Sequence, residues 1–130
     1  MGTTCGLPRG NRNEELNINS TITLRSGLKM PRFGLGTWLS KGKGECYKAT
    51  QVALKNGYRL IDTAALYDNE EDVGKALGEV KMQRDEYYVV TKLASGDHGY
   101  DKALKAIEEQ VKKLGLAYVD LYIIHSPKGK

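Results

Sequence analysis

Hydrophobic and polar positions change their period within residues 57–74, and the rest of the chain is organised around this stretch. An apolar run over residues 58–61 ends abruptly at Asp62, which is typical of a buried strand. After a short polar connection, two glutamates occupy the first turn of a helical pattern. Apolar residues then recur at helical spacing at Val73, Ala76, Leu77 and Val80. The pattern therefore predicts a strand, a loop and an amphipathic helix, which together form a βα unit.

The same alternation of strand and helix patterns repeats along the chain. Short apolar or β-branched runs predict the strands, and apolar stripes at spacings of three and four predict the helices. In chain order the further elements are a β-hairpin (21–30), a strand (33–36), a helix (45–55), a strand (87–93), a helix (101–114) and a last strand (118–124). With the central unit this makes four strands and three helices besides the hairpin. Consecutive βα units of this kind predict a parallel α/β sheet.

Length and composition limit the class of protein. The chain has 130 residues, of which 40% are hydrophobic and 28% charged, as in an ordinary globular domain. A complete TIM barrel usually takes ~250 residues, about twice this length. The basic residues behind the net charge of +4 are spread thinly, with one Phe and one Trp, which favours a solvated surface over nucleic-acid binding. No apolar run approaches the ~20 residues of a membrane span, so no membrane association is expected.

The N-terminal residues differ in character from the rest. Residues 1–18 are polar and have no period, which predicts a flexible tail ahead of a domain over residues 19–130. This tail lacks the apolar segment of a secretory signal. Cys5 and Cys46 match no metal-binding or redox spacing, so we expect no metal site and free thiols in a reducing compartment. These features predict a cytoplasmic protein.

Four polar residues come at the same end of the predicted strands. Asp62 and Tyr67 follow the second strand, Lys92 lies at the end of the third, and His125 follows the fourth. Each alone has an ordinary structural explanation, such as a loop-capping carboxylate or a lysine reaching water. Neighbouring parallel strands lie ~5 Å apart, so groups at their ends can converge on one mouth. The joint placement at three successive strand ends therefore favours a catalytic site.

These residue types suit the reduction of a carbonyl by a hydride donor. As hydride reaches the carbon, negative charge develops on the oxygen, which then needs a proton. A free phenol has a pKa of ~10, and a nearby ammonium favours its ionised form. Tyr67 is therefore the predicted proton donor, with Lys92 increasing its acidity and Asp62 holding Lys92 charged and oriented. His125 would donate a hydrogen bond to the carbonyl and stabilise the developing alkoxide.

These stretches resemble the aldo-keto reductase family. Its first signature begins Gly-(Phe/Tyr)-Arg, passes through Asp-(Ser/Thr)-Ala and closes Glu-x-x-(aliphatic)-Gly. Residues 57–59, 62–64 and 70–74 hold those places without departure. The family's catalytic tetrad is Asp, Tyr, Lys and His in this chain order. Its positions are matched here by Asp62, Tyr67, Lys92 in Val-Thr-Lys, and His125 in Ile-His-Ser-Pro.

The resemblance implies a fold, a cofactor and a substrate class. The fold would be the N-terminal half of a (β/α)8 TIM barrel, a β-hairpin plus four parallel strands and three helices, truncated after the fourth strand. The cofactor would be NADPH and the substrate a small molecule with an aldehyde or ketone carbonyl. The cofactor site would comprise Gly36, Thr37, Trp38 and Asp62. Trp38, Tyr67 and His125 would contact the substrate.

Two further signatures of the family do not occur in this sequence. One is a Gly-aliphatic-Ser-Asn element and the other a Lys-Ser-type segment ending in an Arg that grips the adenosine 2′-phosphate. Both belong to the later strands of the barrel. Ser126 also stands where many relatives have Trp, which alters one wall of the pocket.

Three interpretations stay open. The favoured one is a truncated aldo-keto reductase that is inactive alone. The second is a non-catalytic half-barrel interaction module that self-associates or regulates a full-length relative. Full-length relatives themselves are expected to be monomeric. The third, a Rossmann-type nucleotide domain, is disfavoured because Gly34-Leu35-Gly36 lacks the third glycine of that motif. Close packing of the strand explains these two glycines better.

Overall fold

The computed structural model describes residues 15–40 and 44–128. Most of the predicted tail, residues 1–14, lies outside the described residues. Its last four residues, 15–18, lead into a turn in which the Ser20 amide donates to the Asn17 carbonyl at 3.0 Å. The predicted start of the domain at residue 19 therefore stays a prediction.

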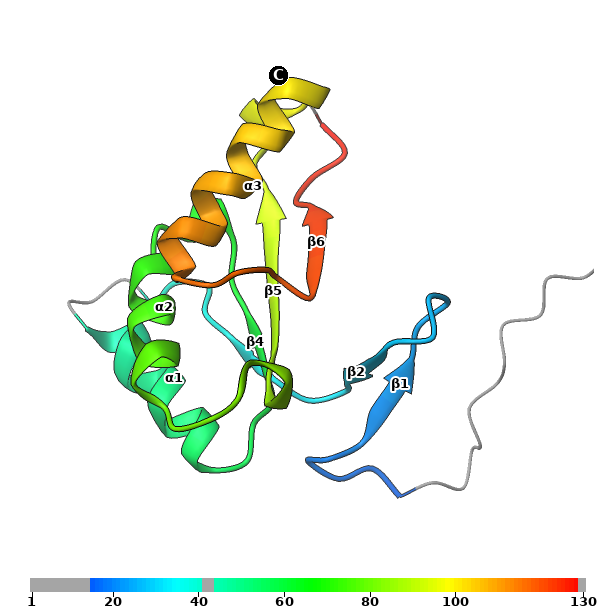
Figure 1. Cartoon of the computed structure of the whole chain (residues 1–130), viewed down its shortest axis with the longest axis vertical. Coiled ribbons are helices and arrows are strands. Elements are labelled where there is room, and N and C mark those ends of the chain that lie inside the picture. The colour runs from blue at the N-terminus through cyan, green and yellow to red at the C-terminus, as the bar shows by residue number, and fades with distance from the viewer. Residues whose placement is uncertain (1–14, 41–43, 129–130) are drawn as a thin grey trace, which may run out of the picture.

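The strands form two separate sheets. β1 (Thr21–Thr23) and β2 (Lys29–Pro31) pair antiparallel as the predicted hairpin, which lies to one side of the molecule (Figure 1). The main sheet contains β3 (Leu35–Gly36), β4 (Leu60–Asp62), β5 (Tyr88–Leu93) and β6 (Leu121–Ile124). These four strands are all parallel and follow their chain order. The predicted parallel arrangement is confirmed.

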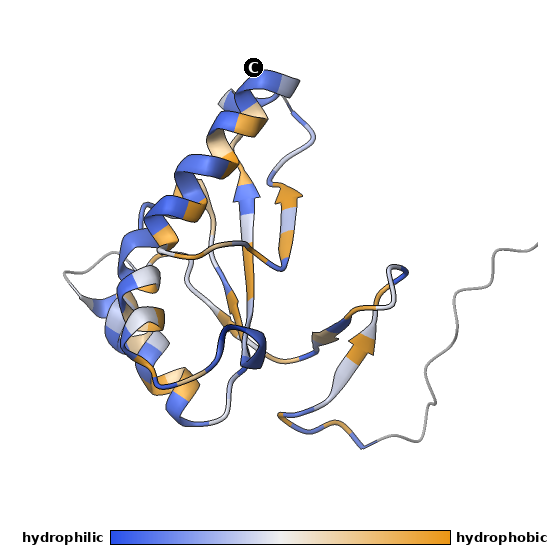
Figure 2. Cartoon of the chain, in the orientation of Figure 1, coloured by the Kyte–Doolittle hydropathy of each residue, from blue (hydrophilic) through white to orange (hydrophobic). Residues whose placement is uncertain are grey.

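Three helices connect the parallel strands. They are α1 (Glu45–Lys55), α2 (Glu70–Glu79) and α3 (Tyr100–Leu114), and all lie on the same face of the sheet (Figure 1). Hydrophobic and hydrophilic positions alternate along each helix (Figure 2), and the buried positions, among them Leu54, Val73 and Leu114, belong to the core, as in amphipathic helices. The arrangement is that of the N-terminal half of a TIM barrel, as predicted. None of the described helices is both long and apolar enough to cross a membrane.

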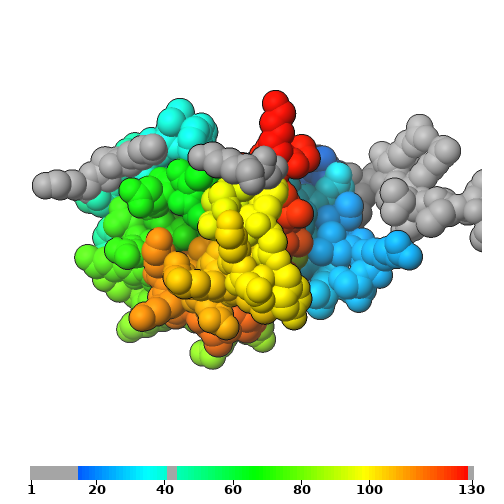
Figure 3. Space-filling model, turned by 90° about the horizontal axis from the view of Figure 1, so that it is seen from above, coloured from blue at the N-terminus to red at the C-terminus, as the bar shows by residue number. Residues whose placement is uncertain are grey.

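Short 3-10 segments in the connections were not predicted from the sequence. They are η1 (Ala65–Tyr67), η2 (Arg84–Glu86) and η3 (Ser95–Asp97). η1 and η3 lie beyond the carboxyl ends of β4 and β5, and η2 precedes β5. Seen from above those carboxyl ends, the C-terminal residues from β6 onward (red) lie between α3 and the hairpin (Figure 3).

The hydrophobic core fills the layer between the helices and the sheet. Its buried members come from all three helices and from the middle strands: Cys46, Leu54, Ile61, Val73, Leu77, Tyr87, Val89 and Leu114. α2 approaches α3 so closely that a Cβ at Gly74 would lie 2.6 Å from the Leu114 carbonyl oxygen. A glycine at this helical position, which costs helix stability by itself, is therefore explained by the contact between the two helices.

The strand predicted over residues 33–36 is shorter than expected. Only Leu35 and Gly36 pair with β4, opposite Ile61 and Asp62. A Cβ at Gly34 would lie 2.5 Å from the Leu60 side chain, so the glycine allows the two strands to approach closely. This bears out the packing explanation for Gly34. The explanation is wrong for Gly36, where a Cβ would meet no atom within 4 Å.

Candidate active site

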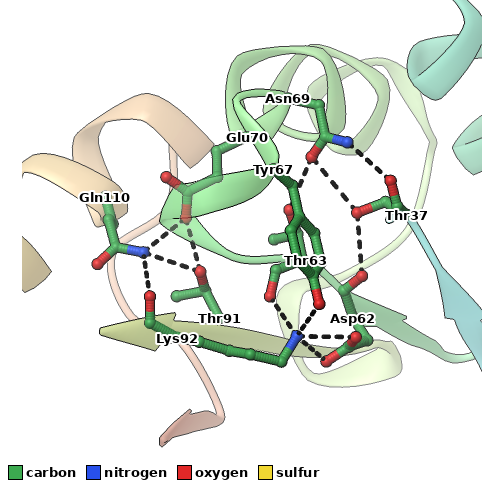
Figure 4. A network of polar contacts seen from close by, with 9 residues as sticks. All are labelled: Thr37, Asp62, Thr63, Tyr67, Asn69, Glu70, Thr91, Lys92 and Gln110. Carbon is green, nitrogen blue, oxygen red and sulfur yellow. Dashed lines mark hydrogen bonds and ion pairs between the residues drawn. The ribbon is translucent and has the colours of Figure 1, made fainter. Parts of the chain in front are cut away.

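Lys92 lies at the centre of a polar cluster on the face of β5 opposite the helices. Val89 of the same strand points to the helical core, and alternation along a strand places Lys92 on the other face. Its Nζ donates to both oxygens of Asp62, at 2.8 and 2.9 Å, and to the Thr63 carbonyl at 2.9 Å (Figure 4). The same Nζ lies 3.0 Å from the Tyr67 hydroxyl. The lysine side chain is 12% exposed.

Tyr67 is held by contacts on several sides of its ring. It lies in η1 and is buried. Lys92 Nζ lies 4.6 Å from its ring centroid, in addition to the contact with its hydroxyl. The Trp38 ring packs against it with centroids 4.9 Å apart, and the His125 ring meets it edge-on at 5.6 Å. The phenol therefore has a fixed place between a cation and two other rings.

His125 follows β6 directly and completes the cluster. Its backbone amide donates to the Leu93 carbonyl at 3.1 Å, which continues the pairing of β6 with β5 past the end of the strand. Its Nδ1 is buried and has no hydrogen-bond partner among the described residues. The ring thus retains hydrogen-bonding capacity at the edge of the site.

The residues predicted for the cofactor site lie next to Asp62. Gly36 is its neighbour in the register of β3 and β4. The amide and the hydroxyl of Thr37 each donate to the Asp62 carbonyl at 3.0 Å. Trp38 is 55% exposed, and a Cβ at Gly36 would meet no atom within 4 Å. The structure thus brings all seven predicted site residues to one mouth, while their roles stay predictions.

Sequence analysis did not identify a second layer of polar residues behind this mouth. Glu70 was placed in the first turn of a helix and in the family signature but was given no role in the site, yet it is 3% exposed. It accepts hydrogen bonds from the Thr91 hydroxyl at 2.6 Å and from Gln110 Nε2 at 2.8 Å (Figure 4). Gln110 falls between Ile107 and Leu114 on the apolar stripe of α3. A polar residue in an apolar stripe is the signal that could have revealed this layer.

Gln110 connects this layer to the strand that carries the lysine. Its Nε2 also donates to the Lys92 carbonyl at 3.2 Å, and its Oε1 accepts from the Tyr122 hydroxyl at 2.7 Å. Burial, together with the negative charge of Glu70, raises the pKa of Tyr122 to about 12. The layer therefore links β5 and β6 to α2 and α3 directly behind the mouth.

Comparison with known proteins agrees with these features. The model of the Aldo/keto reductase family matches residues 32–130. A glyoxal reductase from Bacillus subtilis is 42% identical over 110 residues, which cover 85% of this chain and 40% of that protein. A glycerol 2-dehydrogenase (NADP(+)) from Saccharomyces cerevisiae is 46% identical over 106 residues, covering 82% of this chain and 33% of that protein.

The fold comparison gives the same result. The crystal structure of an aldo-keto reductase from Bombyx mori in complex with NADP superposes with a TM-score of 0.83 at 38% identity. The match covers 88% of this chain and 40% of that one. The chain thus spans between 33% and 40% of the length of these three relatives.

Proposed function

The chain belongs to the aldo/keto reductase family, and from that premise we propose that it supplies the proton-donating side of an NADPH-dependent reductase of aldehyde or ketone carbonyls. The observation that carries this proposal is the distance of 3.0 Å between Lys92 Nζ and the Tyr67 hydroxyl. It joins a phenol to a cation at the carboxyl ends of parallel strands, where catalytic groups of α/β barrels collect.

The relatives support the substrate class and the cofactor. One is named a glyoxal reductase and another an NADP(+)-dependent glycerol 2-dehydrogenase. These names describe the interconversion of small carbonyl compounds and alcohols. The Bombyx mori structure contains NADP. A small carbonyl compound and NADPH are therefore the proposed substrates of the complete barrel.

The residues at the mouth fit the nicotinamide end of such a cofactor. The space at Gly36 is open, Trp38 is half exposed beside it, and His125 has a buried ring nitrogen without a partner among the described residues. Gly36, Thr37, Trp38 and Asp62 would hold the cofactor. When bound, NADPH supplies the hydride that adds to the carbonyl carbon.

Tyr67 donates the proton that the reaction needs. Hydride forms the new C–H bond, the π bond of the carbonyl is lost, and the Tyr67 proton forms the new O–H bond. The phenolate left behind is stabilised by the Lys92 ammonium at 3.0 Å. A proton from solvent then restores the phenol. Hydrogen bonds to Asp62 and to the Thr63 carbonyl hold the Lys92 ammonium in the position from which it stabilises the phenolate.

His125 is proposed to orient the carbonyl. Its ring meets Tyr67 edge-on, so a carbonyl oxygen that accepts the Tyr67 proton would also lie near the imidazole. A donated hydrogen bond at this point stabilises negative charge on the oxygen as it develops. Trp38 and Tyr67 would form the adjacent wall of the substrate pocket.

The proposal can be tested in a chimera of this chain and the part of the Bacillus subtilis relative that follows the fourth strand of its barrel. We expect NADPH-dependent reduction of glyoxal, followed by the absorbance of NADPH. Tyr67→Phe should lower turnover by roughly 10²–10⁴-fold, the usual contribution of a general acid, with little change in NADPH affinity. Unchanged turnover in this variant would show that another group supplies the proton. Titration of NADPH into the 130-residue chain gives the affinity of this half alone.

A second candidate function is self-association, which the edge of the main sheet favours. Within the described residues β6 pairs only with β5, so its other side presents unpaired backbone groups. Ile123 and Ile124 on this strand are 38% and 62% exposed. An exposed, apolar edge strand is a template for pairing with another chain. The occupant proposed here is a second copy of the half-barrel, in the role of an interaction module.

Sedimentation velocity separates this candidate from the first. Self-association predicts dimers or larger species of the 130-residue chain, and Ile124→Lys should shift them to monomer because a charge on an edge strand opposes pairing. Val52→Lys on α1 is the matched control, since Val52 is similarly exposed, at 58%, and far from the edge in the fold. A monomer at all concentrations would exclude this candidate and leave the reductase proposal untouched.

A further inference from the structure

We propose that Asn69 is a positioning residue that keeps Trp38 packed against Tyr67. It acts through the turn over residues 37–40 that carries Trp38, to which its side-chain amide is hydrogen-bonded. The inference deepens the proposed function, because Trp38 and Tyr67 form one wall of the proposed site. The observations that support it concern the turn itself.

The turn adopts a backbone conformation that its sequence does not favour. The Ser40 amide donates to the Thr37 carbonyl at 3.2 Å and closes a β-turn. Leu39, its third residue, has φ of 66°. Turns with a positive φ at the third residue normally have glycine or asparagine there. An L-residue with a side chain is disfavoured in this region. Leu39 is also 68% exposed, so its own packing does not hold it there.

The Asn69 side chain binds both ends of this turn. Its Nδ2 donates to the Thr37 carbonyl at 2.9 Å (Figure 4). It also donates to the Ser40 carbonyl at 3.2 Å. Its Oδ1 accepts from the Thr63 hydroxyl at 2.9 Å and lies 3.4 Å from the Thr37 hydroxyl, whose single proton has a shorter contact with the Asp62 carbonyl, at 3.0 Å. Both donor positions of the amide and its oxygen therefore have partners. Asn69 is 5% exposed, which strengthens these bonds.

These bonds fix the turn relative to the catalytic cluster. Thr63 directly follows Asp62, and Thr37 is bonded to the Asp62 carbonyl as well. Trp38, between the two anchored ends of the turn, packs on Tyr67 with centroids 4.9 Å apart. Strained backbone that persists at a functional site requires surroundings that hold it. Asn69 is that support, and it sets the distance between the tryptophan wall and the proton donor.

Trp38 is the only tryptophan in the sequence, so its fluorescence reports this turn alone. In wild type we expect Trp38 to tumble with the protein, because its turn is anchored. In Asn69→Ala the Trp38 fluorescence should lose most of the slow component of its anisotropy decay and be quenched more strongly by acrylamide. The reason is that the Trp38 side chain then moves on the ps–ns timescale. Asn69→Asp, which keeps the acceptor but loses both donors, should behave in the same way and serves where the alanine variant does not fold.

Gln110→Leu is the matched control. Gln110 is an equally buried amide, 3% exposed, in the other half of the same polar network, and it does not contact the turn. Its loss should lower the melting temperature without changing the Trp38 signals. If Gln110→Leu altered the anisotropy as much as Asn69→Ala, general loosening would explain the effect and the proposal would be wrong.

Leu39→Gly provides a rescue. Glycine takes the left-handed conformation without strain, so the turn should need Asn69 less. We expect the loss of the slow anisotropy component on Asn69→Ala to be clearly smaller in the Leu39→Gly background. Equal losses in both backgrounds would overturn the proposal. All these measurements are made on the free chain without NADPH, so their outcome does not depend on whether the reductase function holds.

Discussion

Two ion pairs stand near opposite ends of β5, and their surroundings differ. Arg84 pairs with Asp120 at 2.6 Å before the strand begins, and Lys92 pairs with Asp62 at 2.8 Å near its end. Both are mostly shielded, with side-chain exposures of 19% and 18% in the first pair and of 12% and 32% in the second. Distance and burial alone would assign them the same role.

The remaining partners separate the two pairs. The Arg84 guanidinium donates to the carbonyls of Tyr87 and Tyr118, both at 2.9 Å, and lies 3.9 Å from the centroid of the Tyr118 ring. Asp120 also accepts from the Val89 amide at 2.8 Å. These partners are backbone groups and a ring face, so the pair joins chain segments. Lys92 instead contacts a phenol that can lose a proton. The Tyr67 hydroxyl beside Lys92, more than the ion pair itself, therefore distinguishes a catalytic role from a structural one.

The largest effect should come from removing the charge of Lys92. In the chimera described above, Lys92→Met should lower turnover by roughly 10²–10⁴-fold, because the phenolate of Tyr67 loses its stabilising cation. NADPH affinity should change little, which fluorescence titration would check. Arg84→Met is the control and should leave turnover per folded molecule unchanged. A comparable loss of turnover in both variants would erase the distinction between the two pairs.

Removal of Arg84 should produce the largest loss of stability. Arg84→Met leaves the shielded Asp120 carboxylate with the Val89 amide, so we expect a loss of roughly 2–3 kcal/mol in the free energy of unfolding. Urea unfolding of the 130-residue chain measures it. In Arg84→Met/Asp120→Leu no unpaired charge remains, and part of the loss should be recovered. If the double variant were as unstable as the sum of the single ones, the pair would not act as a unit.

A pH effect should reveal the contribution of the layer behind Lys92 to stability. The pKa of Tyr122 is about 12 in the folded protein, against ~10 for an unfolded chain. Its contribution to stability is therefore complete below pH ~10 and is lost as the pH rises from about 10 toward 12. Tyr122→Phe should lose less stability than wild type over this range, as thermal melts would record. Parallel loss in both proteins would mean that other groups govern the alkaline transition.

The smallest effect should come from an exposed pair. Lys105 and Glu109 lie one turn apart on α3 at 4.0 Å, with side chains 80% and 61% exposed. Lys105→Met should change the free energy of unfolding by no more than about 0.5 kcal/mol, because solvent and salt screen such pairs. Urea unfolding of Lys105→Met and Arg84→Met under the same conditions would compare the two losses in the free energy of unfolding. A loss as large as that of Arg84→Met would show that burial does not explain their strength.

The sequence predicted the elements of the fold well because their periods are local. The helices over Glu45–Lys55 and Glu70–Glu79 and the parallel order of the strands agree with the structure. Asp62 and Lys92 were expected to pair because groups at neighbouring strand ends can converge and an unpaired buried ammonium is costly. The chemistry of the residue types suggested their roles, and the resemblance to the family gave the same assignment.

The contacts that depend on tertiary structure could not be predicted in this way. Asn69 lies in a short polar connection, and nothing in its neighbours indicates that its amide reaches the turn around Leu39. Glu70 looks like any acidic residue at a helix start, which is normally exposed. Gln110 bonds Glu70 across 40 positions of the sequence, and such a partner is fixed only by how the helices pack. Patterns along the chain locate the mouth, while packing selects what supports it.

Asn69 and Glu70 are consecutive residues that serve opposite sides of the mouth, and this limits how the protein can evolve. Asn69 holds the Trp38 turn, while Glu70 holds β5 and α3. An insertion or deletion between Asp62 and Asn69 would pull both side chains out of place at once. We therefore expect the length of this connection to be constrained, although loops commonly tolerate insertions and deletions. Diversification of substrate choice in a lineage carrying this pair would have to come from the other loops around the mouth.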